Sequence, residues 1–341
     1  MASTAQKIVF LGWIILSLGV AYLFFQLTPV SSGPQYREFE ITKGNGFQGI
    51  VNSLREQNFI RSPKVFMLYG ALTGSAHLLK PGNYLLSSGS STPEILEVIK
   101  RGPSLDVSVI LQEGATLKDM DAILSQKGII SAGSLSKLPV KSLTEKYSFL
   151  KNTKSLEGFL FPDTYRFYKQ SAPAEIAGKI LNTFAVKAWP LLSGCDGQNS
   201  KCSGLNPVEI LTVASLLEKE APIFSDRQMI AGIIYRRLAI GIALQIDATL
   251  VYAKCNGTFI TCADSKVYRK DLTIQSPYNT YLRNTLPPGP IGNPGLEAIK
   301  AALSPIKSKY LYYLSDPKTG KTIFSETLEE HIENRSKYLG V

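Results

Sequence analysis

Residues 206–222 read NPVEILTVASLLEKEAP, and this stretch carries clear signals for a helix. Asn206 suits the N-cap, Pro207 suits the first helical position, and Glu209 stands where a capping box places its acidic residue. Pro222 predicts the end of the helix, because proline cannot continue the helical hydrogen-bond pattern. The stretch therefore predicts a helix that begins at Pro207 and ends just before Pro222.

Glu218 lies on the apolar side of this predicted helix. On a helix that turns about 100° per residue, Leu211, Ala214 and Ser215 lie within roughly 60° of it. Glu220 lies about 200° away, so we expect it to face the polar side and to point away from the cleft in which Glu218 would act. A carboxyl group among apolar neighbours resists ionisation, which suits a general acid near neutral pH. The alternative is a paired structural carboxylate, the commoner use of such a residue.

Residues 8–27 read IVFLGWIILSLGVAYLFFQL, a run of 20 residues without a charge. That length matches the hydrocarbon core of a bilayer, and Lys7 favours a cytoplasmic N-terminus. A cleaved signal peptide with a site near residues 30–32 is the alternative, but its apolar run would be shorter. We therefore expect an uncleaved membrane helix, with nearly the whole protein outside the cytoplasm.

The four cysteines form two pairs with equal spacing. Cys195 and Cys202 are seven residues apart, and so are Cys255 and Cys262. In an oxidising compartment this spacing predicts two local disulfides. A four-thiolate zinc site is the second interpretation, although the short Cys-x2-4-Cys knuckles of zinc sites are missing. Free thiols are the third.

The chain has 341 residues and a formal net charge of +10, enough length for two or three modest domains. Its lysines and arginines are dispersed, and no arginine-rich helix or RNA-binding aromatic motif occurs, so we expect no nucleic-acid partner. An exported basic protein more readily meets anionic lipid headgroups or an anionic cell-wall polymer.

The apolar periodicity predicts an α+β protein. A small module reads strand, helix, helix, strand and helix, and an incomplete second copy begins near residue 105 and gives way to a loop-like stretch. A further helix is expected at 175–189, another capped by Ser225, and a hairpin and a final helix close the chain. The segments of the first module are 38–41, 47–57, 63–72, 83–86 and 92–100.

Four clusters in the C-terminal half combine carboxyl, aromatic and amide side chains. Aromatic faces stack on sugar rings, while Asn, Gln and Thr bind hydroxyl and N-acetyl groups. Taken singly, each cluster also fits a turn, a helix cap or a core aromatic. The clusters are 156–165 (LEGFLFPDTY), 206–222, 243–249 (ALQIDAT) and 276–295 (SPYNTYLRNTLPPGPIGNPG).

Other catalytic schemes fit poorly. The two histidines, His77 and His331, lie in different regions, and no Gly-x-Ser-x-Gly, His-Glu-x-x-His, phosphate-binding loop or dinucleotide fingerprint occurs. Carboxylate chemistry remains, and cleavage of glycosidic bonds is its commonest form.

Together the four clusters, followed by YLYYLSD at 310–316 and FSETLEEH at 324–331, resemble the endolytic murein transglycosylase family (MltG-type, YceG-like). The resemblance covers the C-terminal half in order and spacing, and the N-terminal layout also matches. Two positions depart from the family pattern: Thr285 replaces a glycine before LPPG, and Ile332 replaces an asparagine after His331.

The resemblance implies an enzyme of the bacterial inner membrane, with its catalytic domain in the periplasm. It implies cleavage of the β-1,4 bond between N-acetylmuramic acid and N-acetylglucosamine in nascent strands, with a 1,6-anhydro product. It also implies LysM-like modules and no cofactor or metal, with peptidoglycan synthases (penicillin-binding proteins) as candidate partners. The layout is a cytoplasmic tail (1–7), a transmembrane helix (8–27), a linker (28–36), a LysM-like module (37–104), a second partial module with linker (105–154) and a catalytic domain (155–341).

By the same resemblance, Glu218 is the single catalytic carboxyl, acting first as acid and then as base. The candidates for orienting the sugar and stabilising its positive charge are Glu157, Gln245, Asp247, Tyr278 and Asn279. Two alternatives stay open: a hydrolase that pairs Glu218 with Asp247 or Glu157, and a non-catalytic scaffold that binds the cell wall.

Overall fold

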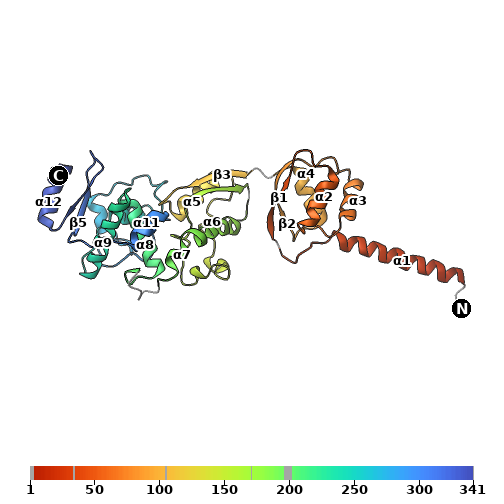
Figure 1. Cartoon of the computed structure of the whole chain (residues 1–341), viewed down its shortest axis with the longest axis horizontal. Coiled ribbons are helices and arrows are strands. Elements are labelled where there is room, and N and C mark those ends of the chain that lie inside the picture. The colour runs from red at the N-terminus through yellow and green to blue at the C-terminus, as the bar shows by residue number, and fades with distance from the viewer. Residues whose placement is uncertain (1–3, 34, 104–105, 170, 196–201, 341) are drawn as a thin grey trace. The chain divides into compact units, whose positions relative to one another are not determined.

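The computed structural model describes residues 4–33, 35–103, 106–169, 171–195 and 202–340. The chain divides into two compact units, Met1–Asp106 and Val107–Val341, and both mix helices with small antiparallel or paired strands. The α+β class predicted from the sequence is therefore confirmed (Figure 1).

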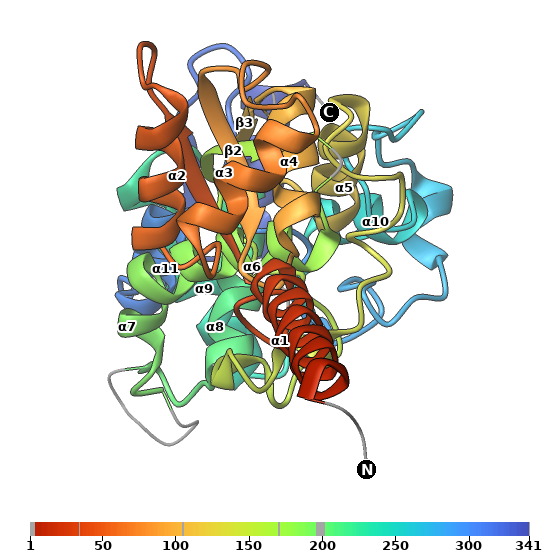
Figure 2. The same cartoon turned by 90° about the vertical axis from the view of Figure 1, so that its right-hand side faces the viewer.

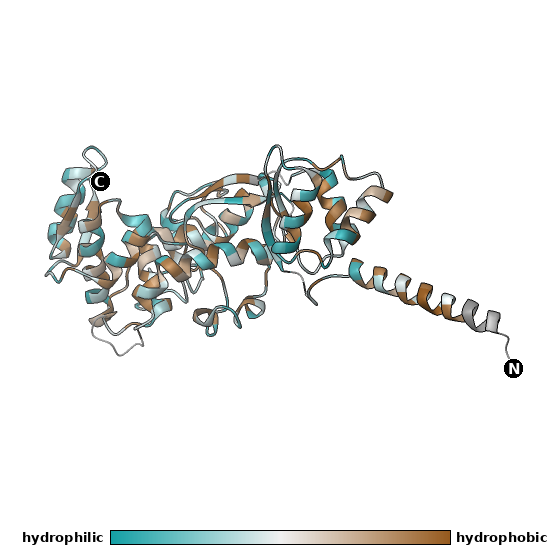
Figure 3. Cartoon of the chain, turned by 45° about the vertical axis from the view of Figure 1, so that its right-hand side comes forward, coloured by the Kyte–Doolittle hydropathy of each residue, from teal (hydrophilic) through white to brown (hydrophobic). Residues whose placement is uncertain are grey.

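The N-terminal helix α1 (Thr4–Leu27) begins slightly before the predicted apolar run and ends with it. Its 18 residues Phe10–Leu27 are the one described segment long and apolar enough to cross a membrane, and none of that window is buried inside the protein. Figure 3 shows the hydrophobic colour along this helix. A helix with no polar side fits a lipid environment better than a protein core.

The first unit has the predicted order of elements. Strands β1 (Tyr36–Ile41) and β2 (Gly82–Ser87) pair antiparallel, with Tyr36 opposite Ser87 and Ile41 opposite Gly82. Helices α2, α3 and α4 pack their apolar residues on this pair to form one core (Figure 2). The helices span Phe47–Glu56, Pro63–Leu72 and Thr92–Arg101.

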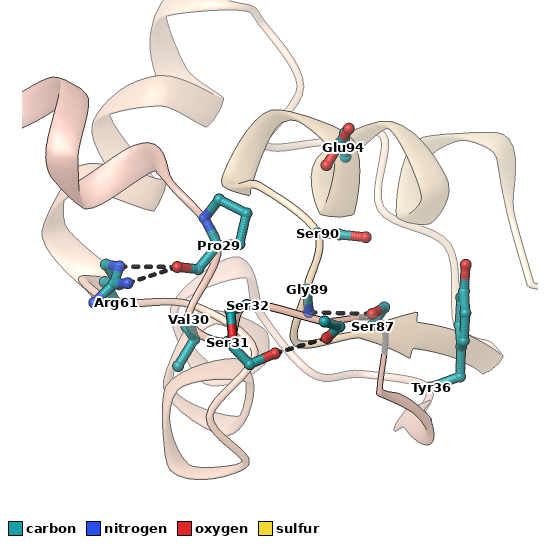
Figure 4. Close-up of a pocket in the computed structure, with 11 residues that line it drawn as sticks. Pro29, Val30, Ser31, Ser32, Tyr36, Arg61, Ser87, Gly89, Ser90 and Glu94 are labelled. Atoms are coloured by element: carbon teal, nitrogen blue, oxygen red, sulfur yellow. Dashed lines mark hydrogen bonds between the residues drawn. The ribbon is translucent and has the colours of Figure 1, made fainter.

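The linker after α1 is held by Arg61, which lies two residues before α3. The Arg61 Nε and Nη2 atoms donate to the Pro29 carbonyl oxygen at 3.1 and 2.6 Å (Figure 4). The same guanidinium lies 4.7 Å from the ring centre of Phe25 in α1. These contacts fix the end of α1 to the module, beside a polar cavity of about 830 Å³.

The second unit has one continuous core that includes residues on both sides of position 154. Strand β3 (Asp106–Leu111) pairs with β4 (Asp163–Tyr168), a strand that the sequence analysis did not predict. Leu111 and Phe159 lie in the same core. The boundary expected between a partial module and a catalytic domain therefore falls inside this unit.

The centre of the second unit is α8 (Pro207–Glu220), which packs against α9 (Phe224–Ala239) and α11 (Leu296–Leu303). The predicted capping box is present: the Asn206 backbone N–H donates to the Glu209 carboxylate at 2.8 Å, and the Asn206 side-chain oxygen accepts from the Glu209 backbone N–H at 3.1 Å. All eight residues from 210 to 217 are buried. A helix buried on every side has no solvent face.

Two helix boundaries differ from the predictions. Ile223, and not Ser225, occupies the N-cap of α9, so the predicted cap is wrong. The helix expected at 175–189 is α6 (Pro173–Lys187) followed by the separate short α7 (Trp189–Leu192). Pro190 explains the break, because proline restricts the residue before it and donates no backbone hydrogen bond.

The remaining elements surround this core. The predicted hairpin is present as β5 (Tyr312–Ser315) and β6 (Thr322–Ser325), with Tyr312 opposite Ser325. The final helix α12 contacts both of its strands. The other elements are α5 (Leu117–Gln126), α10 (Asp247–Lys254), α12 (Leu328–Leu339) and the 3₁₀ turns Val140–Leu143, Ser148–Leu150 and Arg269–Thr273.

Both cysteine pairs are disulfides in the structure. Cys195 joins Cys202 with their Cα atoms 5.5 Å apart, and Cys255 joins Cys262 at 5.4 Å. Both bonds join cysteines seven residues apart, as the sequence predicted, and such bonds are a structural use of cysteine.

Candidate active site

The last turn of α8 carries two carboxyl groups on opposite faces, Glu218 and Glu220. Residues 210–217 are buried, and the last turn that carries the two carboxyl groups is partly exposed. The carbonyl ends of a helix are electrically negative, so an anionic side chain in the last turn is disfavoured unless a neighbour compensates it. The surroundings of the two carboxyl groups therefore determine what each can do.

Glu218 is held in a closed ion pair. The Arg227 Nη2 atom lies 2.6 Å from its Oε1, and the side chains of Glu218 and Arg227 are only 5% and 8% exposed. The Gly295 backbone N–H donates to Oε2 at 2.9 Å. Arg227 Nε also donates to the Ala221 carbonyl oxygen at 2.6 Å. The expectation of purely apolar surroundings for Glu218 is therefore wrong, because α9 supplies a guanidinium that α8 alone could not reveal.

The loop at Gly295 can reach Glu218 only because it lacks a side chain. A Cβ atom at Gly295 would collide with the carboxylate of Glu113. Burial, and then the negative charge of Glu218, raise the pKa of Glu113 above its ordinary value. This side of α8 is thus a packed cluster of charged groups.

Glu220 lies on the other face of α8 and lines a cavity of about 510 Å³. The Tyr313 hydroxyl, from β5, donates to its Oε2 at 2.8 Å. Burial raises the pKa of Glu220 to about 7, the Tyr313 hydrogen bond opposes the rise, and the negative charge of Asp247 adds to it. A carboxyl group that is half protonated near neutral pH can both give and take a proton. Glu220 faces away from Glu218, as expected, but it lines a cavity on its own side of the helix.

Two of the predicted substrate-binding residues line the same cavity. Asp247 is the first residue of α10, and its Oδ1 accepts from the Tyr281 hydroxyl at 2.5 Å. Gln245 lines it with a left-handed backbone (φ 55°), and its N–H donates to the Thr280 carbonyl at 3.0 Å. A non-glycine residue in this conformation is held by its surroundings and often marks a functional loop.

Glu157 lies outside this cavity and is fully partnered. It is 6% exposed, and its Oε1 accepts from the Leu117 backbone at 2.9 Å and from Asn293 at 3.1 Å. Its Oε2 accepts from the Tyr252 hydroxyl at 3.2 Å. Burial is the main cause that raises the pKa of Glu157 to about 8. These contacts tie three segments of the core together.

Tyr278 and Asn279 are not among the residues that line the cavity. Tyr278 packs on Tyr252 with ring centres 4.8 Å apart. Asn279 is fully buried, and its amide donates to the carbonyl oxygens of Leu272 and Ile274 at 3.0 and 2.9 Å. Both side chains shape the loop that presents Tyr281.

The arrangement can be compared with known proteins. A family model described as the YceG-like family matches residues 39–337. This chain belongs to the YceG-like family. The resemblance inferred from the four sequence clusters is confirmed.

Two relatives of this YceG-like protein are endolytic murein transglycosylases. The Bacillus subtilis (strain 168) protein is 31% identical over 341 residues, which cover 95% of this chain and 91% of that protein. The Streptococcus pneumoniae serotype 2 (strain D39 / NCTC 7466) protein is 27% identical over 94% of this chain and 62% of its own length. A crystal structure of a yceG-like protein from Listeria monocytogenes has a TM-score of 0.57 and 32% identity, covering 89% of this chain and 100% of that one.

Several residues that line the cavity of this YceG-like protein were missed by the sequence analysis. The signal that could have found Glu220 is the run of apolar and small residues at 210–217, which leaves the middle of α8 no side for solvent. Among the described residues, no group of three or more His, Cys, Asp or Glu could hold a metal. The missed residues are Glu220, Arg237, Tyr281, Tyr312, Tyr313, His331 and Arg335.

Proposed function

We propose that this protein is an endolytic lytic transglycosylase of peptidoglycan, and that Glu220 is its general acid and base. Membership of the YceG-like family and the names of its relatives support the reaction. The observation that carries the choice of residue is a carboxyl group with a pKa of about 7 on the wall of a 510 Å³ cavity. That pKa is matched to the task of donating and then accepting a proton.

The reaction needs one carboxyl group. Protonated Glu220 donates its proton to the glycosidic oxygen between N-acetylmuramic acid and N-acetylglucosamine, and the bond from C1 to that oxygen breaks. Glu220, now a carboxylate, takes the proton of the C6 hydroxyl of the muramyl residue as this oxygen attacks C1. A 1,6-anhydro ring forms, the carboxyl group is regenerated, and no water is consumed.

The neighbours of Glu220 supply the other requirements. The Asp247 carboxylate places a negative charge in the cavity where the sugar ring develops positive charge. Gln245 offers an amide that suits a hydroxyl or N-acetyl group. Tyr313, bonded to one oxygen of Glu220, leaves the other oxygen for the substrate.

Under this proposal Glu218 is a positioning residue. Its ion pair with Arg227 and its hydrogen bond from Gly295 join α8, α9 and the loop before α11. Each of its oxygens has a protein partner and its side chain is 5% exposed, which favours a structural role. We therefore propose Glu220 as the acid in place of Glu218.

Hydrolysis is the second candidate, because Glu220 and Asp247 line one cavity and two carboxyl groups are what most glycosidases use. The products separate the two reactions. We would digest uncross-linked glycan with the purified full-length protein and identify the ends by mass spectrometry. Anhydro-muramyl ends support transglycosylation, whereas reducing muramyl ends would overturn it in favour of hydrolysis. No cleavage by the wild type would support a wall-binding scaffold.

The location and partners of the enzyme are part of the same proposal. The apolar helix α1 supports a single-pass anchor in the bacterial inner membrane, with residues 1–7 in the cytoplasm and the rest in the periplasm. The two disulfides support an oxidising compartment. We further propose that cleavage terminates growing strands beside the penicillin-binding proteins that make them. The strand–helix–helix–strand order of β1, α2, α3 and β2 supports a LysM-like module.

A further inference from the structure

The cavity that holds Glu220 has a second, basic wall. Arg237 of α9 and His331 and Arg335 of α12 line it together with the acidic residues Glu220 and Asp247. The His331 ring stacks on Tyr312 with ring centres 5.3 Å apart. The Arg237 guanidinium lies 4.9 Å from the centre of the same tyrosine ring. The Tyr312 ring therefore contacts both Arg237 of α9 and His331 of α12.

Arg237 is a buried cation without a carboxylate partner in the described part of the chain. It is 7% exposed, and its Nε donates to the Leu311 carbonyl oxygen at 2.7 Å. Its Nη1 donates to the carbonyl oxygens of Ala243 and Leu244 at 3.0 and 2.8 Å. Its Nη2 makes no hydrogen bond to any residue that the structure describes and is not sealed from solvent. A buried unpaired charge is costly, so its position on a cavity wall is significant.

Arg335 continues this wall at the surface. It lies one helical turn after His331 on the same face of α12, and it is exposed. No ion pair joins Arg335 to a residue within the described ranges. The His331 Nδ1 is buried without a hydrogen-bond partner among the same residues. The basic wall therefore offers the Nη2 atom of Arg237 and the exposed guanidinium of Arg335 to a ligand in the cavity.

We propose that Arg237, His331 and Arg335 bind a carboxylate of the muramyl residue and so select which sugar occupies the cavity beside Glu220. This inference rests on the proposed function. The muramyl residue is the sugar of the strand that bears a lactyl group, and it carries either a free lactyl carboxylate or the carboxylates of a stem peptide. N-acetylglucosamine carries neither. A basic wall opposite the acid would therefore choose between the two alternating β-1,4 bonds.

The test measures binding in a protein that cannot cut its ligand. Full-length Glu220→Gln protein in detergent would be titrated with three uncross-linked glycans. The first carries stem peptides, the second has free lactyl carboxylates after amidase treatment, and the third has those carboxylates converted to methylamides. The same titrations would be made after adding Arg335→Glu, with Lys337→Gln on the same helix as the matched control.

We expect Arg335→Glu to weaken binding of the carboxylate-bearing glycans about tenfold, as for a charge reversed at the rim of a site. Binding of the methylamide glycan is expected to change less than about twofold, and Lys337→Gln is expected to have no effect on any ligand. Sensitivity of the peptide-bearing glycan alone assigns the carboxylate to the peptide, and sensitivity of the amidase-treated glycan assigns it to the lactyl group.

Equal losses on all three glycans, or no loss on any, would overturn the proposal. In the active background, Arg335→Glu is expected to raise KM and leave kcat within about twofold, which a general loss of folding would not do. The proposed function is tested separately: an active Glu220→Gln protein would remove Glu220 from catalysis without changing the binding result.

Discussion

The two faces of the last turn of α8 place the same side chain in opposite surroundings. Glu218 meets a guanidinium and a backbone N–H in a closed cluster. Glu220, two residues later, meets a tyrosine hydroxyl and an open cavity. Both sit at the negative end of a helix, so both need compensation. An arginine and a backbone N–H occupy the carboxyl oxygens on one side, whereas burial favours the protonated carboxyl group on the other. The groups around each carboxyl, and not its position on the helix, therefore distinguish a structural carboxylate from a candidate general acid.

Breaking the buried ion pair between Glu218 and Arg227 is expected to give the largest loss of stability. Arg227→Met would leave Glu218 buried without its partner, and such a change costs about 3–5 kcal/mol. Urea unfolding measures it. The matched control is Arg236→Met on the exposed side of α9, expected to cost less than about 1 kcal/mol. A loss below that value for Arg227→Met would mean that the pair contributes little to the fold.

Glu157 is a third buried carboxyl group, and it does not line the cavity that holds Glu220. Its folded pKa of about 8 lies above its unfolded value, so its contribution to stability is fully present below the unfolded pKa and is lost as pH rises to about 8. From pH 5 to 8, wild type should lose up to about 4 kcal/mol relative to Glu157→Gln. Urea unfolding of both proteins at the two pH values checks this. A difference that does not change with pH would contradict a raised pKa.

Tyr313→Phe tests the hydrogen bond that Glu220 accepts on the cavity side of α8. The hydrogen bond from Tyr313 lowers the pKa of Glu220, so its removal should raise that pKa above about 7. Because a general acid loses activity as pH rises through its pKa, the alkaline limb of the pH–rate profile should move up by as much as about one unit. An alkaline limb that moves down, or stays in place, would separate Tyr313 from the acid.

The smallest effect is expected for an ion pair at the surface. Lys187 and Asp163 are 2.6 Å apart, like Glu218 and Arg227, but their side chains are 48% and 34% exposed. Lys187→Gln should therefore cost less than about 1 kcal/mol by urea unfolding. A loss as large as that of Arg227→Met would show that burial does not distinguish the two pairs.

Much of the architecture could be predicted from local signals. The capping box at Asn206, the cysteine pairs, the hairpin and the apolar N-terminal helix all depend on nearby residues. Strand β4 was missed because the pairing with β3 that defines it joins segments about fifty residues apart in the chain.

The site was predicted only in part, because it too depends on contacts between segments that are distant in the chain. Asp247 and Gln245 line the cavity as expected. The roles of Glu218 and Glu220 depend on Arg227 and Tyr313, which come from α9 and β5. A helical wheel assigns faces to solvent or to core, but α8 is surrounded by other elements and has no solvent face.

The most direct test of the central claim is the rate of glycan cleavage by Glu218→Gln and Glu220→Gln, measured at pH 6.5 on the same uncross-linked substrate after both proteins are shown to be folded. Removing the acid is expected to lower kcat by at least about a thousandfold in Glu220→Gln, whereas Glu218→Gln should stay within about tenfold of wild type. The reverse pattern, with Glu220→Gln active and Glu218→Gln inactive, would contradict the account and return catalysis to Glu218.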